Sequence, residues 1–230
     1  MQLLSVKKSL LAFSVVVVAS IGNVLSACST TTQSQTPTIK ATEASNKQQD
    51  AHDGMNHSGM SHNMDLGPAD ADFDLRFIDG MVPHHDGGVV MAKEAPQKSK
   101  RPEIRKLADE IIKAQDKEIT QMKQWRQNWY PKAPSTPMAW HAQMNHMMPM
   151  STEQIKSMRM DMDLGEGNAQ FDLRFLDAMI PHHEGAVVMA EDAVKKSKRP
   201  EIKKLAQTII SSQQVEIEQM KGWRQAWYKK

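Results

Sequence analysis

An internal repeat is the feature that most limits how this chain can fold. Residues 64–130 align with residues 162–228 at a constant offset of 98 positions, without a gap. Of the 67 aligned positions, 44 are identical, which indicates a duplication. The two copies should therefore adopt the same fold, and they can pack against each other with pseudo-twofold symmetry.

Each copy predicts a pair of helices. In the first copy, apolar side chains recur at steps of three and four from about residue 72 to 95, and again from about 102 to 129. The second helix carries two apolar stripes, one through Leu107 and Ile111 and one through Ala108 and Ile112. Either stripe can form the buried face of the helix. Two such pairs predict an all-α fold, a four-helix bundle built from two duplicated helical hairpins.

The main functional motif lies inside the first helix of each copy. A methionine, a proline and two adjacent histidines occur there, and a second methionine follows the histidines. The proline predicts a kink just before the histidines. Imidazole and thioether are ligands for soft ions such as Cu(I) and Ag(I), whereas Mg²⁺ and Ca²⁺ prefer oxygen. The candidate metal ligands are Met81, His84, His85, Met91, Met179, His182, His183 and Met189.

Four carboxylates are candidates for orienting these imidazoles through their second ring nitrogens. Asp86 and Glu184 directly follow the histidines, while Glu118 and Glu216 can reach a histidine from the second helix of each pair. A solvent-exposed position is the alternative for all four carboxylates. The methionines of the motif have an alternative too, because they can simply fill the bundle core.

Two further segments combine methionine and histidine with small polar residues. The first shows no helical or strand period, so we expect it to be disordered without a ligand. The second belongs to a crossover rich in proline, methionine and histidine, which ends with a capping box at residues 151–154 and a short helix. The further candidate metal ligands are His52, Met55, His57, Met60, His62, Met64, His141, Met144, His146, Met147, Met148 and Met150.

The first 28 residues predict an export signal. Two lysines precede an apolar stretch, residues 10–21, which is too short to span a membrane as a helix. The sequence Leu-Ser-Ala-Cys that ends at Cys28 resembles a bacterial lipobox, so Cys28 is expected to carry lipid. The protein should therefore be exported and lipid-anchored to the cell envelope, facing the periplasm or the cell exterior.

Composition narrows the ligand types and the partners. Cys28 is the only cysteine, so the soft ligands of the mature protein must be methionine and histidine, and 17 of the 18 methionines follow Met1. Without the two lysines of the leader, 27 basic residues face 27 acidic ones. No basic stripe or nucleic-acid motif is present, so nucleic acid is not an expected partner.

The motifs of the repeat resemble a known family. The pattern is Phe-Asp-x-x-Phe, Met-[Val/Ile]-Pro-His-His-x-Gly, Met-Ala, and then Gln-x-x-Glu-Ile-x-x-Met and Trp. It is similar to the DUF305 family of bacterial exported proteins over about residues 64–230. The resemblance implies a ferritin-like bundle and a periplasmic copper-binding protein linked to copper tolerance. It also implies methionine and histidine ligands, at the eight positions of the duplicated motif.

These observations predict a copper-binding envelope lipoprotein that is not an enzyme. It would hold Cu(I), and also Ag(I), and would sequester the ion or pass it to a copper-transfer protein of the envelope. A structural or adaptor lipoprotein with a methionine-packed core is the alternative. A di-iron oxidase is less favoured, because the chain has no Glu-x-x-His. The expected divisions are residues 1–28, signal; 29–63, tether; 64–130, first repeat; 131–161, crossover; and 162–230, second repeat.

Overall fold

Helices account for most of the computed structural model, which describes residues 65–230. The predicted leader with Cys28, the tether and the first Met/His segment lie outside the described residues. The elements in chain order are α1 (Phe73–Ala92), α2 (Ala95–Lys98), α3 (Pro102–Trp129), β1 (Met138–His141), β2 (His146–Pro149), α4 (Thr152–Arg159), α5 (Phe171–Lys196) and α6 (Pro200–Tyr228).

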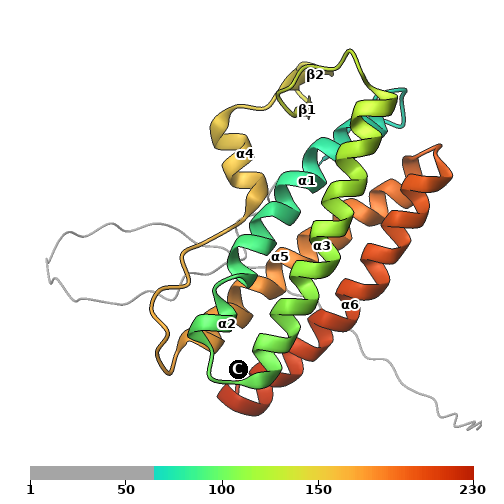
Figure 1. The fold of residues 1–230 in the computed structure, drawn as a ribbon. Coiled ribbons are helices and arrows are strands. Elements are labelled where there is room, and N and C mark those ends of the chain that lie inside the picture. The colour runs from blue at the N-terminus through green and yellow to red at the C-terminus, as the bar shows by residue number, and fades with distance from the viewer. Residues whose placement is uncertain (1–64) are drawn as a thin grey trace, which may run out of the picture. The chain divides into compact units, whose positions relative to one another are not determined.

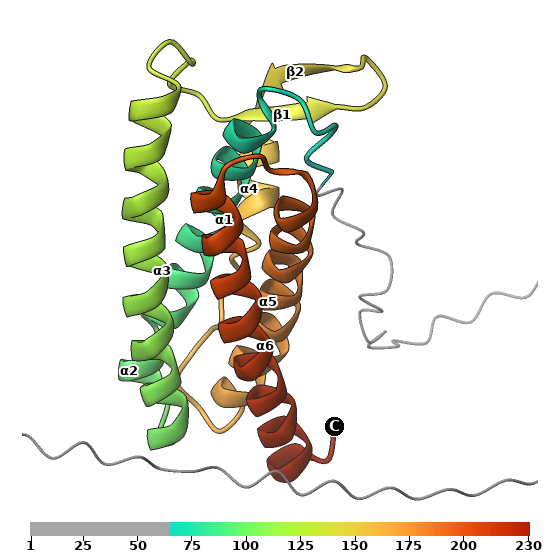
Figure 2. The same ribbon diagram turned by 90° about the vertical axis from the view of Figure 1, so that its right-hand side faces the viewer.

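The four long helices form the predicted bundle. Helix α1 packs along α3 in the first repeat, and α5 packs along α6 in the second (Figures 1 and 2). Contacts between α1 and α5 join the two helical hairpins, so the first helix of each repeat lies at the interface between the repeats. The all-α fold and the duplicated hairpins are as expected from the sequence.

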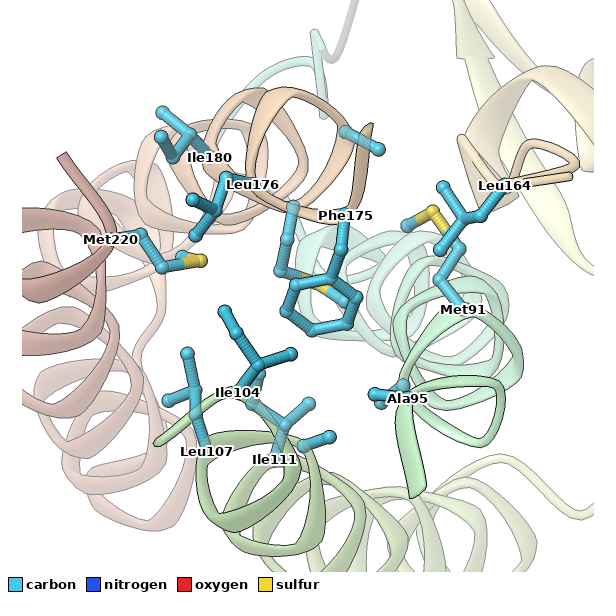
Figure 3. Packing of buried hydrophobic residues seen from close by; sticks show 14 of the residues in the cluster. Met91, Ala95, Ile104, Leu107, Ile111, Leu164, Phe175, Leu176, Ile180 and Met220 are labelled. Atoms are coloured by element: carbon cyan, nitrogen blue, oxygen red, sulfur yellow. The ribbon is translucent and has the colours of Figure 1, made fainter. Parts of the chain in front are cut away.

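The core consists of two apolar clusters, and each combines side chains from both repeats. Figure 3 shows one of them, in which Phe175 of α5 lies near Ile104 and Ile111 of α3. Met91 of α1 belongs to the same cluster and is drawn beside Leu164. On α3 both predicted stripes contribute, because Leu107, Ala108 and Ile111 are all buried. The two stripes thus merge into one wide apolar face, whose burial stabilises the bundle.

Proline accounts for the different ends of the first helices in the two repeats. Helix α5 runs on to Lys196, whereas α1 ends at Ala92 and the separate turn α2 follows. Pro96 lies in α2, at the position that Val194 occupies in α5. Proline lacks the amide hydrogen that continues a helix and disfavours helical backbone at the preceding residue. Both helices nevertheless continue through their internal prolines, Pro83 and Pro181.

The crossover between the repeats holds one element that the sequence did not predict. Strands β1 and β2 pair antiparallel, with His141 opposite His146, and lie against the start of α1. The predicted capping box is present at the start of α4. The side-chain oxygen of Ser151 accepts the backbone amide of Gln154, and the side-chain oxygen of Gln154 accepts the backbone amide of Ser151. Among the helices of residues 65–230, none is long and apolar enough to cross a membrane.

Candidate metal centre

The duplicated histidines meet in the middle of the bundle. His84 and His85 lie on α1, His182 and His183 lie on α5, and all four side chains are fully buried. The ring centroids of His84 and His182 are 4.0 Å apart, so equivalent residues of the two repeats contact each other at the interface. His85 and His183 flank this central pair, at 6.5 Å from His84 and 6.2 Å from His182 respectively.

His182 is held as a neutral imidazole. Its Nε2 lies 3.0 Å from the carbonyl oxygen of His84 and 3.1 Å from that of Arg159, at the end of α4. Carbonyl oxygens only accept hydrogen bonds, so Nε2 carries the hydrogen and Nδ1 keeps a lone pair. Burial, followed by the nearby charges of His183 and His85, lowers the pKa of His182 to about 3. The Nδ1 atom is buried and has no hydrogen-bond partner within residues 65–230.

The two outer histidines are each oriented by a glutamate of the same repeat. Nε2 of His85 lies 2.8 Å from Oε2 of Glu118, and Nε2 of His183 lies 2.8 Å from Oε2 of Glu216. A carboxylate that accepts the Nε2 hydrogen leaves Nδ1 as the metal-binding atom, an arrangement common around metal-bound histidines. In the described part of the chain, neither Nδ1 atom has a hydrogen-bond partner.

The other two candidate carboxylates lie elsewhere. Glu184 is exposed and pairs with Lys221 at 2.8 Å, and Asp86 is partly exposed. No hydrogen bond joins either one to a histidine within residues 65–230. The carboxylates that orient the imidazoles therefore come from α3 and α6, 33 residues after the outer histidines, and not from the neighbouring positions.

The four methionines of the motif flank the histidines and are fully buried. Met91 and Met179 belong to one apolar cluster, and Met81 and Met189 belong to the other. Each cluster therefore contains one methionine about one turn from the histidines of its own helix and one about two turns away. Neutral imidazole nitrogen beside thioether sulfur is a donor set for soft and borderline metal ions.

Sequence reasoning did not include two buried amide side chains, one of them close to a histidine, among the site residues. The Oε1 atoms of Gln115 and Gln213 are buried without a hydrogen-bond partner among the described residues. A Cβ atom at Gly88 would lie 2.7 Å from Oε1 of Gln115 and 3.0 Å from Cε1 of His182, so glycine lets these two side chains approach the helix closely. The Gly-Gly pair that follows the first His-His pair is the sequence signal that could have indicated this close approach of side chains to the helix.

The remaining candidate ligands are divided between the β-hairpin and the N-terminal segment. His52, Met55, His57, Met60, His62 and Met64 lie outside the described residues. On and beside the hairpin, Met150 is buried, Met144 is 57% exposed and Met147 contacts Arg76. Within residues 65–230, no three side chains of the His, Asp and Glu types come together as a metal site.

Comparisons with known proteins place the chain among relatives of similar fold. The model of DUF305, a domain of unknown function, matches residues 19–126 and 74–224. The structure of CopM in the Cu(I)-bound form is 40% identical and covers 67% of this chain and 97% of its own, with a TM-score of 0.53. CopM in the Ag-bound form gives 38% identity over the same shares, also with a TM-score of 0.53.

Two other relatives have less specific names. A DUF305 fragment from Deinococcus radiodurans is 29% identical, over 67% of this chain and 96% of its own, with a TM-score of 0.50. An uncharacterised protein of Acanthamoeba polyphaga mimivirus is 49% identical over 49 residues, or 21% of this chain. The matched part spans only 32% of that viral protein.

Proposed function

Since this chain belongs to the DUF305 family, we propose that it binds copper, chiefly as Cu(I), and also Ag(I), as cargo at the histidines and methionines of its bundle. CopM, which is similar over nearly its whole length, has been solved with Cu(I), with Cu(II) and with silver. This likeness supports the choice of metal. The choice of residues rests on the geometry of this chain.

One observation carries the proposal. Three buried imidazoles, those of His85, His182 and His183, each use Nε2 in a hydrogen bond, and no residue of the described range 65–230 bonds their Nδ1 atoms. An unsatisfied buried nitrogen normally destabilises a fold, so its repetition favours a role in binding a ligand. The imidazole of His182 is neutral, and the thioethers nearby need no deprotonation, so a monovalent soft ion can bind to these donors without expelling a proton.

We place this binding at the cell envelope. Cys28 and the apolar stretch before it support export and attachment of a lipid at the mature N-terminus. From that position the protein would sequester copper or pass it to a copper-transfer protein of the envelope. Either activity would contribute to copper tolerance. Mass spectrometry of the N-terminal peptide, which should carry acyl chains on Cys28, tests the anchor.

A structural or adaptor role remains the second candidate, because Met81, Met91, Met179 and Met189 all pack in the apolar core. The two candidates differ in their response to metal. A ligand that binds only the folded state raises its stability, by about 2.7 kcal/mol at a hundredfold excess over Kd. A protein whose methionines serve only in packing should show the same melting temperature with and without Cu(I).

Titration with Cu(I) against a competing chelator tests the site itself. In the double variant His85→Gln and His183→Gln, the amide of each glutamine can still donate a hydrogen bond to its glutamate, but the Nδ1 donor is lost. We expect the tightest sites to disappear while circular dichroism shows an unchanged helix content. Met162→Leu, at an exposed methionine outside the bundle, is the matched control and should retain full affinity. Equal affinity in the double variant would overturn the proposed site.

A further inference from the structure

The β-hairpin of the crossover brings three soft donors onto one of its faces. In the ladder His141 lies opposite His146, and Trp140 lies opposite Met147. Side chains that are directly opposed in an antiparallel pair point to the same face, with Cβ atoms about 4.5–5.5 Å apart, and residues two apart on a strand share a face. His141, His146 and Met148 therefore share one face, which we term the histidine face.

The opposite face of the hairpin is used for packing. The guanidinium of Arg76, on α1, lies 5.2 Å from the ring centroid of Trp140. The Nη1 atom of Arg76 also lies 3.8 Å from the sulfur of Met147. The thioether of Met147 is thus occupied as a weak acceptor, whereas that of Met148 lies on the other face, beside the two histidines.

Both histidines of this face can present a ring nitrogen. Nδ1 of His146 lies 3.0 Å from the carbonyl oxygen of Met144, so Nδ1 carries the hydrogen and Nε2 keeps its lone pair. His146 is exposed, so solvent reaches that ring. Nδ1 of His141 is buried and has no hydrogen-bond partner among residues 65–230. One exposed and one buried imidazole nitrogen are therefore both available for a metal.

The turn of the hairpin holds the two histidines in register. Four residues connect the strands, and the amide of Met144 donates to the carbonyl of His141 at 3.1 Å. Asn145 has a φ of 53°, a left-handed conformation that asparagine adopts more readily than most residues. The donors are thus brought together before any metal arrives, which lowers the entropy lost on binding.

We propose that the histidine face binds one monovalent coinage-metal ion, Cu(I) or Ag(I), through His141, His146 and Met148, at a site separate from the bundle histidines. The inference rests on the proposed function for the nature of the cargo. Coordination uses lone pairs only, so no electron or proton changes hands. The protein would then offer a partly exposed site on the crossover in addition to the buried one in the bundle.

Titration of the full chain with Ag(I) in chloride-free buffer tests this site residue by residue. With methyl-labelled methionine and ¹⁵N-labelled histidine, NMR should show the Met148 methyl and the rings of His141 and His146 shifting in one saturable step. Either His146→Gln or Met148→Leu should abolish that step. Met144→Leu should leave it unchanged, because Met144 lies in the turn and is 57% exposed.

The same spectra separate the two proposals. A weakening by Met144→Leu as large as that by Met148→Leu would indicate a loose methionine cluster and would overturn the histidine-face site. Shifts of the Met81 and Met179 methyls without any at Met148 would also overturn it, while the proposed function would stand. Shifts at Met148 alone would support the histidine face and count against the bundle site.

Discussion

The Nε2 atom of His182 donates a hydrogen bond of 3.0 Å to the backbone carbonyl of His84, its own counterpart 98 residues earlier in the chain. The same nitrogen lies 3.1 Å from the carbonyl oxygen of Arg159, in the crossover. The crossover occurs once in the chain and is not part of the repeat. Its hydrogen bond to His182 therefore makes the surroundings of His182 differ from those of His84. The bundle centre is thus built from duplicated residues in unequal surroundings.

The stability of the protein should fall at acidic pH because of His182. Its pKa is about 3 in the folded protein and about 6.5 when unfolded. Between these values the unfolded chain binds a proton that the folded chain excludes, so the free energy of unfolding rises with pH by about 1.4 kcal/mol per unit from this residue. Above pH 6.5 His182 is neutral in both states, so it no longer makes the free energy of unfolding depend on pH. Urea denaturation at pH 4, 5, 6 and 7 measures the slope.

His182→Gln provides the comparison for this experiment. Glutamine can donate to the same carbonyl oxygens but does not titrate, so the variant should lose most of the slope between pH 4 and 6. Equal slopes in the two proteins would show that the acid sensitivity arises from other groups.

Removal of Glu118 should weaken metal binding in the bundle. Its carboxylate accepts the Nε2 hydrogen of His85, and loss of such a partner typically lowers metal affinity about 10- to 100-fold. Glu118→Ala and Glu216→Ala should act alike in a Cu(I) competition titration, because they occupy the same position in the two repeats. Glu110→Ala, an exposed change on the same helix, should leave the affinity unaltered.

The two repeats also provide a matched test of a buried ion pair. Asp79 is 2% exposed, lies 3.1 Å from Nη2 of Arg126 and accepts the amide of Met138, so it links α1, α3 and β1. Its counterpart Asp177 is 44% exposed and, within residues 65–230, pairs only with Arg224, at 3.2 Å. In chemical denaturation Asp79→Ala should lower the free energy of unfolding by about 3–5 kcal/mol, and Asp177→Ala by less than about 1 kcal/mol. A similar loss of stability in the two variants would mean that the burial of Asp79 does not make its ion pair more important than that of Asp177.

Two glycines of α1 should respond in opposite ways to alanine. A Cβ at Gly87 would lie far inside the contact distance of the Arg159 carbonyl, so the end of α4 must move. The expected loss for Gly87→Ala is about 1–3 kcal/mol. At Gly80 the nearest atoms would be 3.6 Å away, so Gly80→Ala should be neutral or stabilise the helix by up to about 1 kcal/mol. Thermal unfolding of both variants measures the difference, and a destabilised Gly80→Ala would contradict this packing argument.

Much of the fold could be predicted from the sequence because its main features are local. Helical spacing placed the four long helices, Pro102 marked the start of α3, and Ser151 with Gln154 marked the start of α4. A hydrogen bond between Glu118 and a histidine, one of the two alternatives for this carboxylate, is present as well, with His85 as the donor. The four-residue strands of the hairpin were missed, since such short runs show no period that distinguishes them from a loop.

The sequence by itself determined the duplicated helices and the positions of the paired histidines on them, since both follow from periodicity along one chain segment. Only the tertiary structure decided that His84 and His182 meet, that Arg159 reaches Gly87 and His182, and that His141 faces His146. Such contacts depend on which faces of distant elements pack together and in what register. That choice is set by the burial of side chains from both repeats at once, which no local pattern records.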